Sequence, residues 1–200
     1  MPRHTLLLAL LFTGVAQRLH AQTEYYARVG AVGASNLLHD VLVTELTLRQ
    51  SIAPMVALGG SLPIGPRAYR ANIEATLASG KFHRNQNGSS TNIGTLRTAT
   101  VMLGLEGPVW KDVRWRAGIG VIQYWPAHDE GIFQSGGTAR FLVGGGADYR
   151  RPVLAKWDLM TSVRYDFHHF RTGTIEARGF SQSQSVSRVS LSVGLSRSFR

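Results

Sequence analysis

Cysteine is absent from this chain of 200 residues. A chain without cysteine forms no disulfide framework, so its stability must come from a packed core or a closed backbone ladder. Long apolar runs are also absent: the longest, residues 5–16, spans about 12 residues, whereas a membrane-spanning helix needs roughly 20. If the chain crosses a membrane, it must therefore do so with strands that close into a barrel.

The short apolar run lies at the N-terminus and is typical of a secretory signal. Arg3 and His4 provide a basic start, residues 5–16 provide the apolar core, and Ala21 offers a small residue at the cleavage point. We expect residues 1–21 to be a signal peptide cleaved near Ala21, and residues 22–200 to form one domain.

Acidic residues are scarce, with 12 against 22 basic ones, and the net charge is +10. A basic excess is one mark of nucleic-acid binding, but the export signal argues against a nucleic-acid partner. For an exported protein, the anionic groups of outer-membrane lipids and lipopolysaccharide are better-placed partners.

Alternation of apolar and polar residues dominates from Tyr25 onward, and a period of two is typical of strands. The pattern is cleanest from Tyr69 to Leu77. Eight strands are predicted, at residues 25–33, 52–62, 69–77, 96–107, 113–124, 139–149, 157–167 and 186–199.

The predicted connections alternate in length along the chain. Short turns follow the second, fourth and sixth strands, the last of them at residues 150–156. Long loops follow the third, fifth and seventh strands, at residues 81–94, 125–137 and 171–185. Such alternation is typical of outer-membrane barrels. Residues 35–51 are too apolar for an ordinary loop, so an early start to the second strand, a short helix and a count of ten strands all stay open.

The two faces of the strands differ in chemistry. The apolar faces carry aromatic residues near the strand ends, as do the girdles of outer-membrane barrels; these are Tyr25, Tyr69, Tyr149, Trp157, Phe167 and Phe199. The opposite faces carry charges of both signs, which we expect to form an ionic network inside the barrel: Arg28, Arg70, Glu74, Glu106, Arg114, Arg116, Arg140, Asp148, Asp158, Arg164, Asp166 and Arg188.

A soluble, lipocalin-like secreted barrel would show the same alternation with its apolar face inward. The period of two does not separate these arrangements. The alternating loop lengths and the aromatic strand ends favour the membrane.

The last strand carries an independent signal. Ser192, Gly194 and Phe199 match the C-terminal pattern by which the assembly machinery of the outer membrane recognises its clients, whereas Arg197 departs from it. With the signal peptide and the strand layout, the chain resembles the OmpA-like or OmpW-like eight-stranded barrels. The resemblance implies an all-β fold, an antiparallel up-and-down transmembrane β-barrel in the bacterial outer membrane, and a partner in the barrel assembly machinery.

Candidate chemistry is sparse. His168 and His169 lie beside Asp166, and a His with a nearby carboxylate and a Ser could form a hydrolytic triad. A resemblance to outer-membrane lipid A deacylases would require a His-x-Ser arrangement there, but His169 and Phe170 follow His168, so a triad is not expected. His39, His83 and His128 fall in or beside predicted loops at spacings that fit no metal motif. Gly144 to Gly146 lack the Lys-Ser/Thr of a phosphate loop. We therefore expect no catalytic residue, metal or cofactor.

The sequence thus predicts a monomeric barrel with a structural or surface-interaction role, filled by its own polar and charged side chains. The alternatives are a narrow channel for small or apolar solutes, a lipid-modifying enzyme and the soluble barrel.

Overall fold

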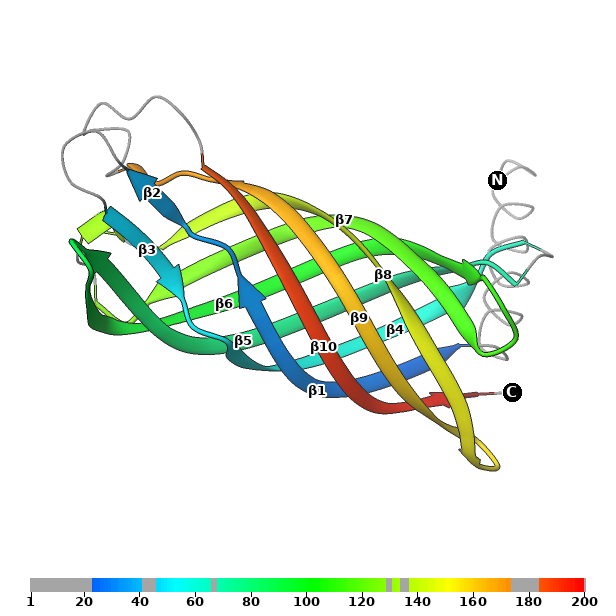
Figure 1. Cartoon of the computed structure of the whole chain (residues 1–200). Coiled ribbons are helices and arrows are strands. Elements are labelled where there is room, and N and C mark those ends of the chain that lie inside the picture. Colours follow the sequence, from blue (N-terminus) through cyan, green and yellow to red (C-terminus); the bar gives the residue numbers. More distant parts are fainter. Residues whose placement is uncertain are drawn as a thin grey trace, which may run out of the picture.

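A computed structural model describes residues 23–40, 46–65, 68–128, 131–133, 137–173 and 184–199. The predicted signal peptide and its cleavage point lie outside these residues. Nearly all of the described chain is antiparallel sheet, and eight strands of that sheet close into a tilted barrel (Figure 1).

The eight barrel strands follow one another around the ring in chain order. They are β1 (Glu24–Ala34), β4 (Ala53–Pro63), β5 (Arg70–Gln86), β6 (Ser89–Pro108), β7 (Val113–Pro126), β8 (Thr138–Leu154), β9 (Trp157–Phe170) and β10 (Gln184–Ser198). Strand β1 pairs with β10 from Glu24 opposite Ser198 to Ala34 opposite Arg188, which closes the ring. The prediction of an eight-stranded antiparallel up-and-down barrel is confirmed.

Each strand is built on the alternation that the sequence displays. In β10, Ser190, Ser192 and Ser196 are buried, whereas the side chains of Leu191, Val193 and Leu195 are about half exposed. Successive side chains of a strand point to opposite faces, so one face of every strand lines the barrel interior and the other forms its outer wall.

Within residues 35–51, the described residues form two short strands at the end of the barrel opposite the chain termini. Strand β2 (Leu38–Asp40) pairs with β3 (Leu46–Gln50), and β3 pairs in turn with the far end of β5 (Figure 1). The described part of this segment is therefore neither a helix nor a ninth and tenth strand of the ring.

The prediction of a long loop at residues 81–94 is wrong. Strand β5 continues to Gln86, the chain turns at Asn87 and Gly88, and β6 begins at Ser89. Asn87 and Gly88 have φ angles of 51° and 77°. Positive φ at both central residues is what a tight two-residue hairpin turn requires, and Asn-Gly is its preferred sequence.

The prediction of a connection at residues 150–156 is too long. Strand β8 continues to Leu154, and only Ala155 and Lys156 form the turn to β9. The other predicted long loops are described only in part: a short 3-10 helix, η1 (Gly131–Phe133), follows β7, and residues 174–183 lie outside the described chain. No described helix is long and apolar enough to cross a membrane.

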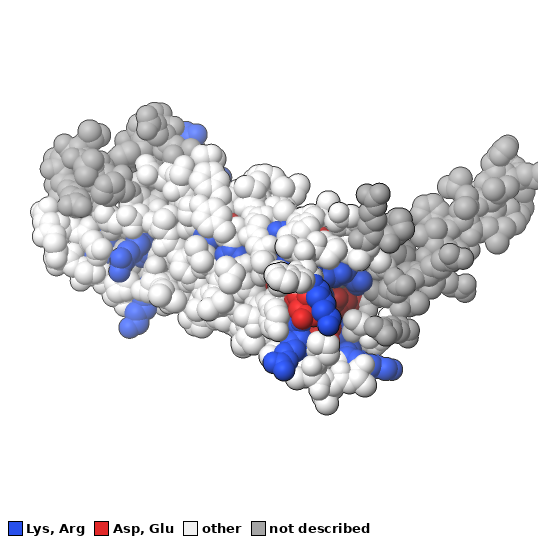
Figure 2. Space-filling model, turned by 45° about the vertical axis from the view of Figure 1, so that its right-hand side comes forward, with Lys and Arg blue, Asp and Glu red and all other residues white. Residues whose placement is uncertain are grey.

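The outer wall of the barrel is apolar. Leu77, Leu103 and Val193 are among many large apolar side chains that remain 45% to 63% exposed. Figure 2 shows acidic and basic side chains gathered at the end of the barrel where β1 begins and β10 ends, while most of the wall on the side in view is uncharged. Such a continuous apolar surface is rare on soluble proteins. The lipocalin-like arrangement, with the apolar face inward and the charges outward, is therefore wrong.

Candidate functional site: a charged and plugged interior

Glu74, on β5, is the centre of the ion pairs inside the barrel. Its carboxylate accepts hydrogen bonds from Arg28, from Arg116 Nη1 at 2.6 Å, from Arg164 Nη1 at 2.6 Å and from Tyr26 Oη at 2.9 Å. These partners come from β1, β7 and β9, so the contacts reach across the barrel. Glu74 is only 2% exposed.

A second carboxylate, Glu106 on β6, lies nearer the end with the chain termini and is fully buried. Four guanidinium groups approach it: Arg114 at 3.0 Å, Arg150 at 3.3 Å, Arg116 at 3.4 Å and Arg70 at 3.5 Å. Because Arg116 contacts both Glu74 and Glu106, it links the two carboxylates into one network.

Two aspartates extend this network. Asp148 on β8 pairs with Arg116 Nε at 3.0 Å and accepts a hydrogen bond from Ser162 Oγ at 2.5 Å. Asp166 on β9 accepts from Arg164 Nε at 3.0 Å and from its Nη2 at 2.7 Å. Buried charges are tolerated when they are paired and hydrogen-bonded in this way.

Three of the predicted interior charges lie apart from the network. Arg188 is buried, but its described hydrogen bond goes to Thr98 Oγ1 at 3.1 Å, and no carboxylate of the described chain lies within ion-pair distance. Arg140 donates to main-chain carbonyls near the opposite end. Asp158 is half-buried at the mouth near the chain termini and has no ion pair among the described residues.

Sequence reasoning left Glu24, Tyr26 and Arg150 out of the predicted network. Arg150 pairs with Glu24 and with Glu106, but it was assigned to a connection rather than to β8. Glu24 stands one residue before the predicted first strand, and Tyr26 is on the same face as Arg28, so the alternation could have included both.

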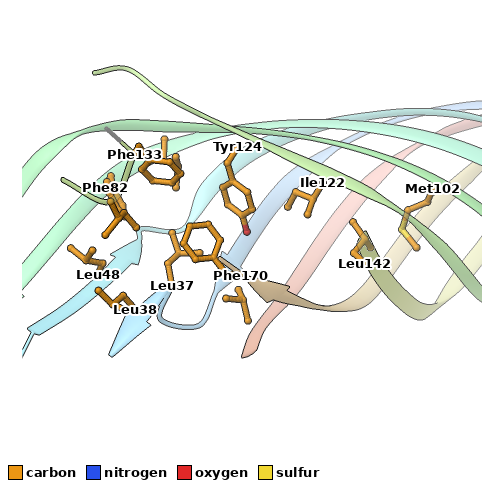
Figure 3. Packing of buried hydrophobic residues seen from close by; sticks show 13 residues of the cluster. Leu37, Leu38, Leu48, Phe82, Met102, Ile122, Tyr124, Phe133, Leu142 and Phe170 are labelled. Carbon is orange, nitrogen blue, oxygen red and sulfur yellow. The ribbon is translucent and has the colours of Figure 1, made fainter. Parts of the chain in front are cut away.

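The half of the interior away from the chain termini is mainly apolar, although Arg188 is buried there beside Thr98. Its buried side chains, which we call the apolar plug, come from the hairpin β2–β3, from η1 and from the inner faces of the barrel strands (Figure 3). The plug comprises Leu37, Leu38, Leu48, Phe82, Leu96, Met102, Ile122, Tyr124, Ile132, Phe133, Leu142, Phe170 and Val186. The expectation of an interior filled throughout by polar and charged side chains is therefore corrected.

Aromatic rings form the centre of the plug. The ring centroid of Phe170 lies 5.2 Å from that of Tyr124 and 5.8 Å from that of Phe133, and Phe82 lies 5.9 Å from Phe133. The contacts are edge-to-face, the arrangement that aromatic pairs prefer. The sequence contains one indication of the plug. Ile122 and Tyr124 alternate in phase with Arg116 along β7, so their side chains are expected to point into the barrel.

His168 lies beside Tyr124 of the plug and does not form a hydrolytic triad. Its Nε2 is 2.7 Å from the hydroxyl of Tyr124, and its Nδ1 has no hydrogen-bond partner among the described residues. A triad needs a nucleophile on one ring nitrogen and a carboxylate on the other. His169 points outward, and its ring centroid is 5.3 Å from that of Phe167.

The predicted assembly-signal residues lie at the seam between β1 and β10. Gly194 is opposite Arg28, and a side chain there would overlap the main chain of Ala27 and Arg28. Phe199 is exposed on the outer wall, and its ring centroid is 5.7 Å from that of Tyr25. Over the described ranges, no group of three or more His, Asp or Glu side chains is placed to hold a metal ion.

Comparison with known proteins yields structural matches only. No protein-family model matches the chain, and no curated protein matches its sequence. Among solved structures, Neisserial surface protein A is similar with a TM-score of 0.55 at 11% identity, covering 88% of this chain and 97% of that one. The outer membrane protein OprG from Pseudomonas aeruginosa is similar with a TM-score of 0.52 at 10% identity, covering 91% and 97%.

A third solved structure is Ail, the attachment invasion locus protein of Yersinia pestis, in complex with the heparin analogue sucrose octasulfate. It is similar with a TM-score of 0.50 at 10% identity, covering 89% of this chain and 99% of that one. At such identities the likeness concerns the fold. The chain has the fold of the eight-stranded outer-membrane β-barrels.

Proposed function

We propose that the chain is a monomeric β-barrel of the bacterial outer membrane whose interior is closed, with a structural or surface-interaction role rather than a transport role. The apolar wall supports a membrane location, because only helices and closed barrels satisfy their backbone groups in lipid. The shared fold of the similar structures supports the outer membrane.

The observation that carries this proposal is the closure of the interior at two levels. Glu74 and its three arginines connect strands on different sides of the ring. The cavity beside them has a volume of about 20 Å³, which is room for about one water molecule. The apolar plug closes the interior on the other side of this cavity. A channel needs a continuous water-filled path through the barrel. The ion pairs around Glu74 and the apolar plug both block such a path.

Planar-bilayer recording tests the closed barrel. We expect the refolded protein to insert without stepwise conductance at moderate voltage. Folding is checked on the same sample by gel mobility, since a folded outer-membrane barrel should migrate differently before and after boiling. Stepwise openings from samples that pass this check would favour the narrow channel instead.

A cluster of outward-facing cations supports a surface-interaction role. Arg49 on β3, Lys81 on β5 and Arg97 on β6 are exposed, on adjacent strands at the end opposite the chain termini. Arg97 lies beside Trp125 of β7 in the strand register. Guanidinium and ammonium groups at this end of the barrel can bind the phosphates of lipopolysaccharide through charge-assisted hydrogen bonds. The sulfated ligand bound by the similar structure of Ail is also a polyanion.

Vesicle binding tests this partner. The triple variant Arg49→Gln, Lys81→Gln and Arg97→Gln should lose most of the protein's preference for vesicles containing lipopolysaccharide over vesicles of phosphatidylcholine. Arg151→Gln, which removes an exposed arginine near the other end, is the matched control and should keep that preference. Equal effects of the two variants would count against the cluster as the contact surface.

A further inference from the structure

Arg197 lies on the outer wall of the barrel, near the end with the chain termini. Its guanidinium carbon is 5.4 Å from the ring centroid of Trp157 and 5.0 Å from that of Phe199. Its Nε is buried without a hydrogen-bond partner, and no carboxylate of the described chain is within ion-pair distance. A cation held between two rings but left without an anion is placed to accept one from outside the chain.

An apolar groove runs along the wall from this arginine. It follows the seam of β1 and β10 and the neighbouring strand β4, and its volume is about 740 Å³. Its apolar lining includes Ala27, Leu58, Val193, Gly194 and Leu195. The aromatic rings of Trp157 and Phe199 stand at the same end as Arg197.

We propose that Arg197 and this groove form a binding site for one glycerophospholipid, with the phosphate on the guanidinium and an acyl chain in the groove. The charge of the ligand follows from the unpaired cation, and its apolar tail follows from the lining. The volume is within the range of roughly 300–1,000 Å³ that ligand sites span. The site is at the end of the barrel that carries the chain termini and the short β6–β7 and β8–β9 connections. Short turns face the periplasm in outer-membrane barrels, so the lipid belongs to the periplasmic leaflet. This inference rests on the proposed membrane location.

The geometry favours a lipid over other occupants. A soluble phosphate ester would contact Arg197 but leave the groove uncovered. A second copy of the chain would cover the groove but would bring the same arginine toward its symmetry mate. A phospholipid satisfies both halves of the site, because it joins an anion to a long apolar tail.

Native mass spectrometry of the folded protein in detergent tests the site. The protein is titrated with phosphatidylglycerol, with diacylglycerol, which has no phosphate, and with glycerol phosphate, which has no acyl chain. We expect a one-to-one complex with phosphatidylglycerol, at an affinity about tenfold above that for diacylglycerol. We expect no complex with glycerol phosphate.

Three variants separate the site from general lipid contact. Arg197→Gln should lower the affinity for phosphatidylglycerol about tenfold, and Ala27→Leu, which fills the groove from an exposed position, should lower it several-fold. Arg151→Gln, another outward arginine near the same end, should leave it unchanged.

Equal affinities of Arg197→Gln and Arg151→Gln for phosphatidylglycerol would overturn the proposal, as would equal binding of diacylglycerol and phosphatidylglycerol. A dimer that lipid does not dissociate would assign the groove to a second copy. Gel mobility before and after boiling shows whether each variant is a folded barrel, so a failed lipid site is distinguishable from a failed membrane barrel.

Discussion

The carboxylate of Glu74 has four hydrogen-bonding partners on three other strands, and three of these partners are guanidinium groups. Removing one member of a buried ion pair leaves the remaining charge desolvated and unpaired, which costs more than the pair contributes. The loss of Glu74 should therefore destabilise the barrel strongly.

Glu74→Gln should lower the free energy of unfolding by about 3–5 kcal/mol. The expected loss is measured by urea titration of the protein in lipid vesicles, with gel mobility as the readout. Asp158→Asn is the control, because Asp158 is half-buried at the mouth without an ion pair among the described residues; its effect should stay within about 0.5 kcal/mol. Similar losses for the two variants would contradict the central position of Glu74.

Gly59 on β4 leaves the space that the ring of Tyr26 occupies. A Cβ at Gly59 would lie 2.6 Å from Tyr26 Cε2 and even nearer the phenol oxygen, so Gly59→Ala should push Tyr26 away from Glu74. Overpacking of this kind costs about 1–3 kcal/mol.

Gly60→Ala is the matched control for Gly59→Ala in the same urea titration. A Cβ at Gly60 faces the outer wall, 3.3 Å from Tyr25 Cδ1, and its effect should stay within about 0.5 kcal/mol. A Gly59→Ala variant with the same free energy of unfolding as the unchanged protein would contradict this prediction, because Tyr26 would then have another position to occupy.

For a single residue, the sequence indicates which face of the strand its side chain lies on, but not which side chain it pairs with. Alternation places Arg164 and Glu74 on inner faces, yet they are 90 residues apart and meet across the barrel. Which arginine reaches which carboxylate depends on the strand order and on the stagger between strands. A periodic pattern carries neither quantity.

Among the elements, the extended hairpin of β5 and β6 differs most from its prediction. Its polar residues suggest a loop because, beyond Phe82, most side chains of the two strands are exposed rather than covered by lipid or by a core. Polarity there reflects water on both faces rather than the absence of strands. The Asn87–Gly88 pair was the available signal, since Asn-Gly between two strands is a strong hairpin indicator.

Gly88→Val should loosen this hairpin without unfolding the barrel. A β-branched residue at a φ of 77° is strained, so the turn opens and the strand ends separate. Limited trypsin digestion at Lys81 and Arg84 should become faster, while the mobility shift on boiling is unchanged. Ser90→Val, an exposed strand position one step past the turn's end, is the control and should leave the digestion rate as it is. Unchanged digestion of Gly88→Val would contradict the tight turn.

At the scale of the whole molecule, alternation predicts the barrel, and its strand count is confirmed. Which face of each strand points outward was harder to predict. A membrane barrel with its apolar face outward and a soluble barrel with its apolar face inward show the same alternation of period two. Aromatic residues at strand ends, such as Tyr25 and Tyr149, favoured the outward apolar face, and the structure exposes both. The apolar plug was not predicted, because it depends on Leu37, Leu38 and Leu48, which lie outside the predicted strands, packing against the inner faces of the barrel.

The absence of cysteine allows a direct measurement of which face meets lipid. Single cysteines at Ser192 and Val193, neighbours on β10 with opposite faces, are spin-labelled in the protein reconstituted into vesicles. We expect the label at 193 to collide readily with oxygen, which concentrates in lipid, and the label at 192 to be shielded from it. A label at 193 that instead collides mainly with a water-soluble relaxation agent would contradict a membrane-spanning barrel whose apolar face meets lipid.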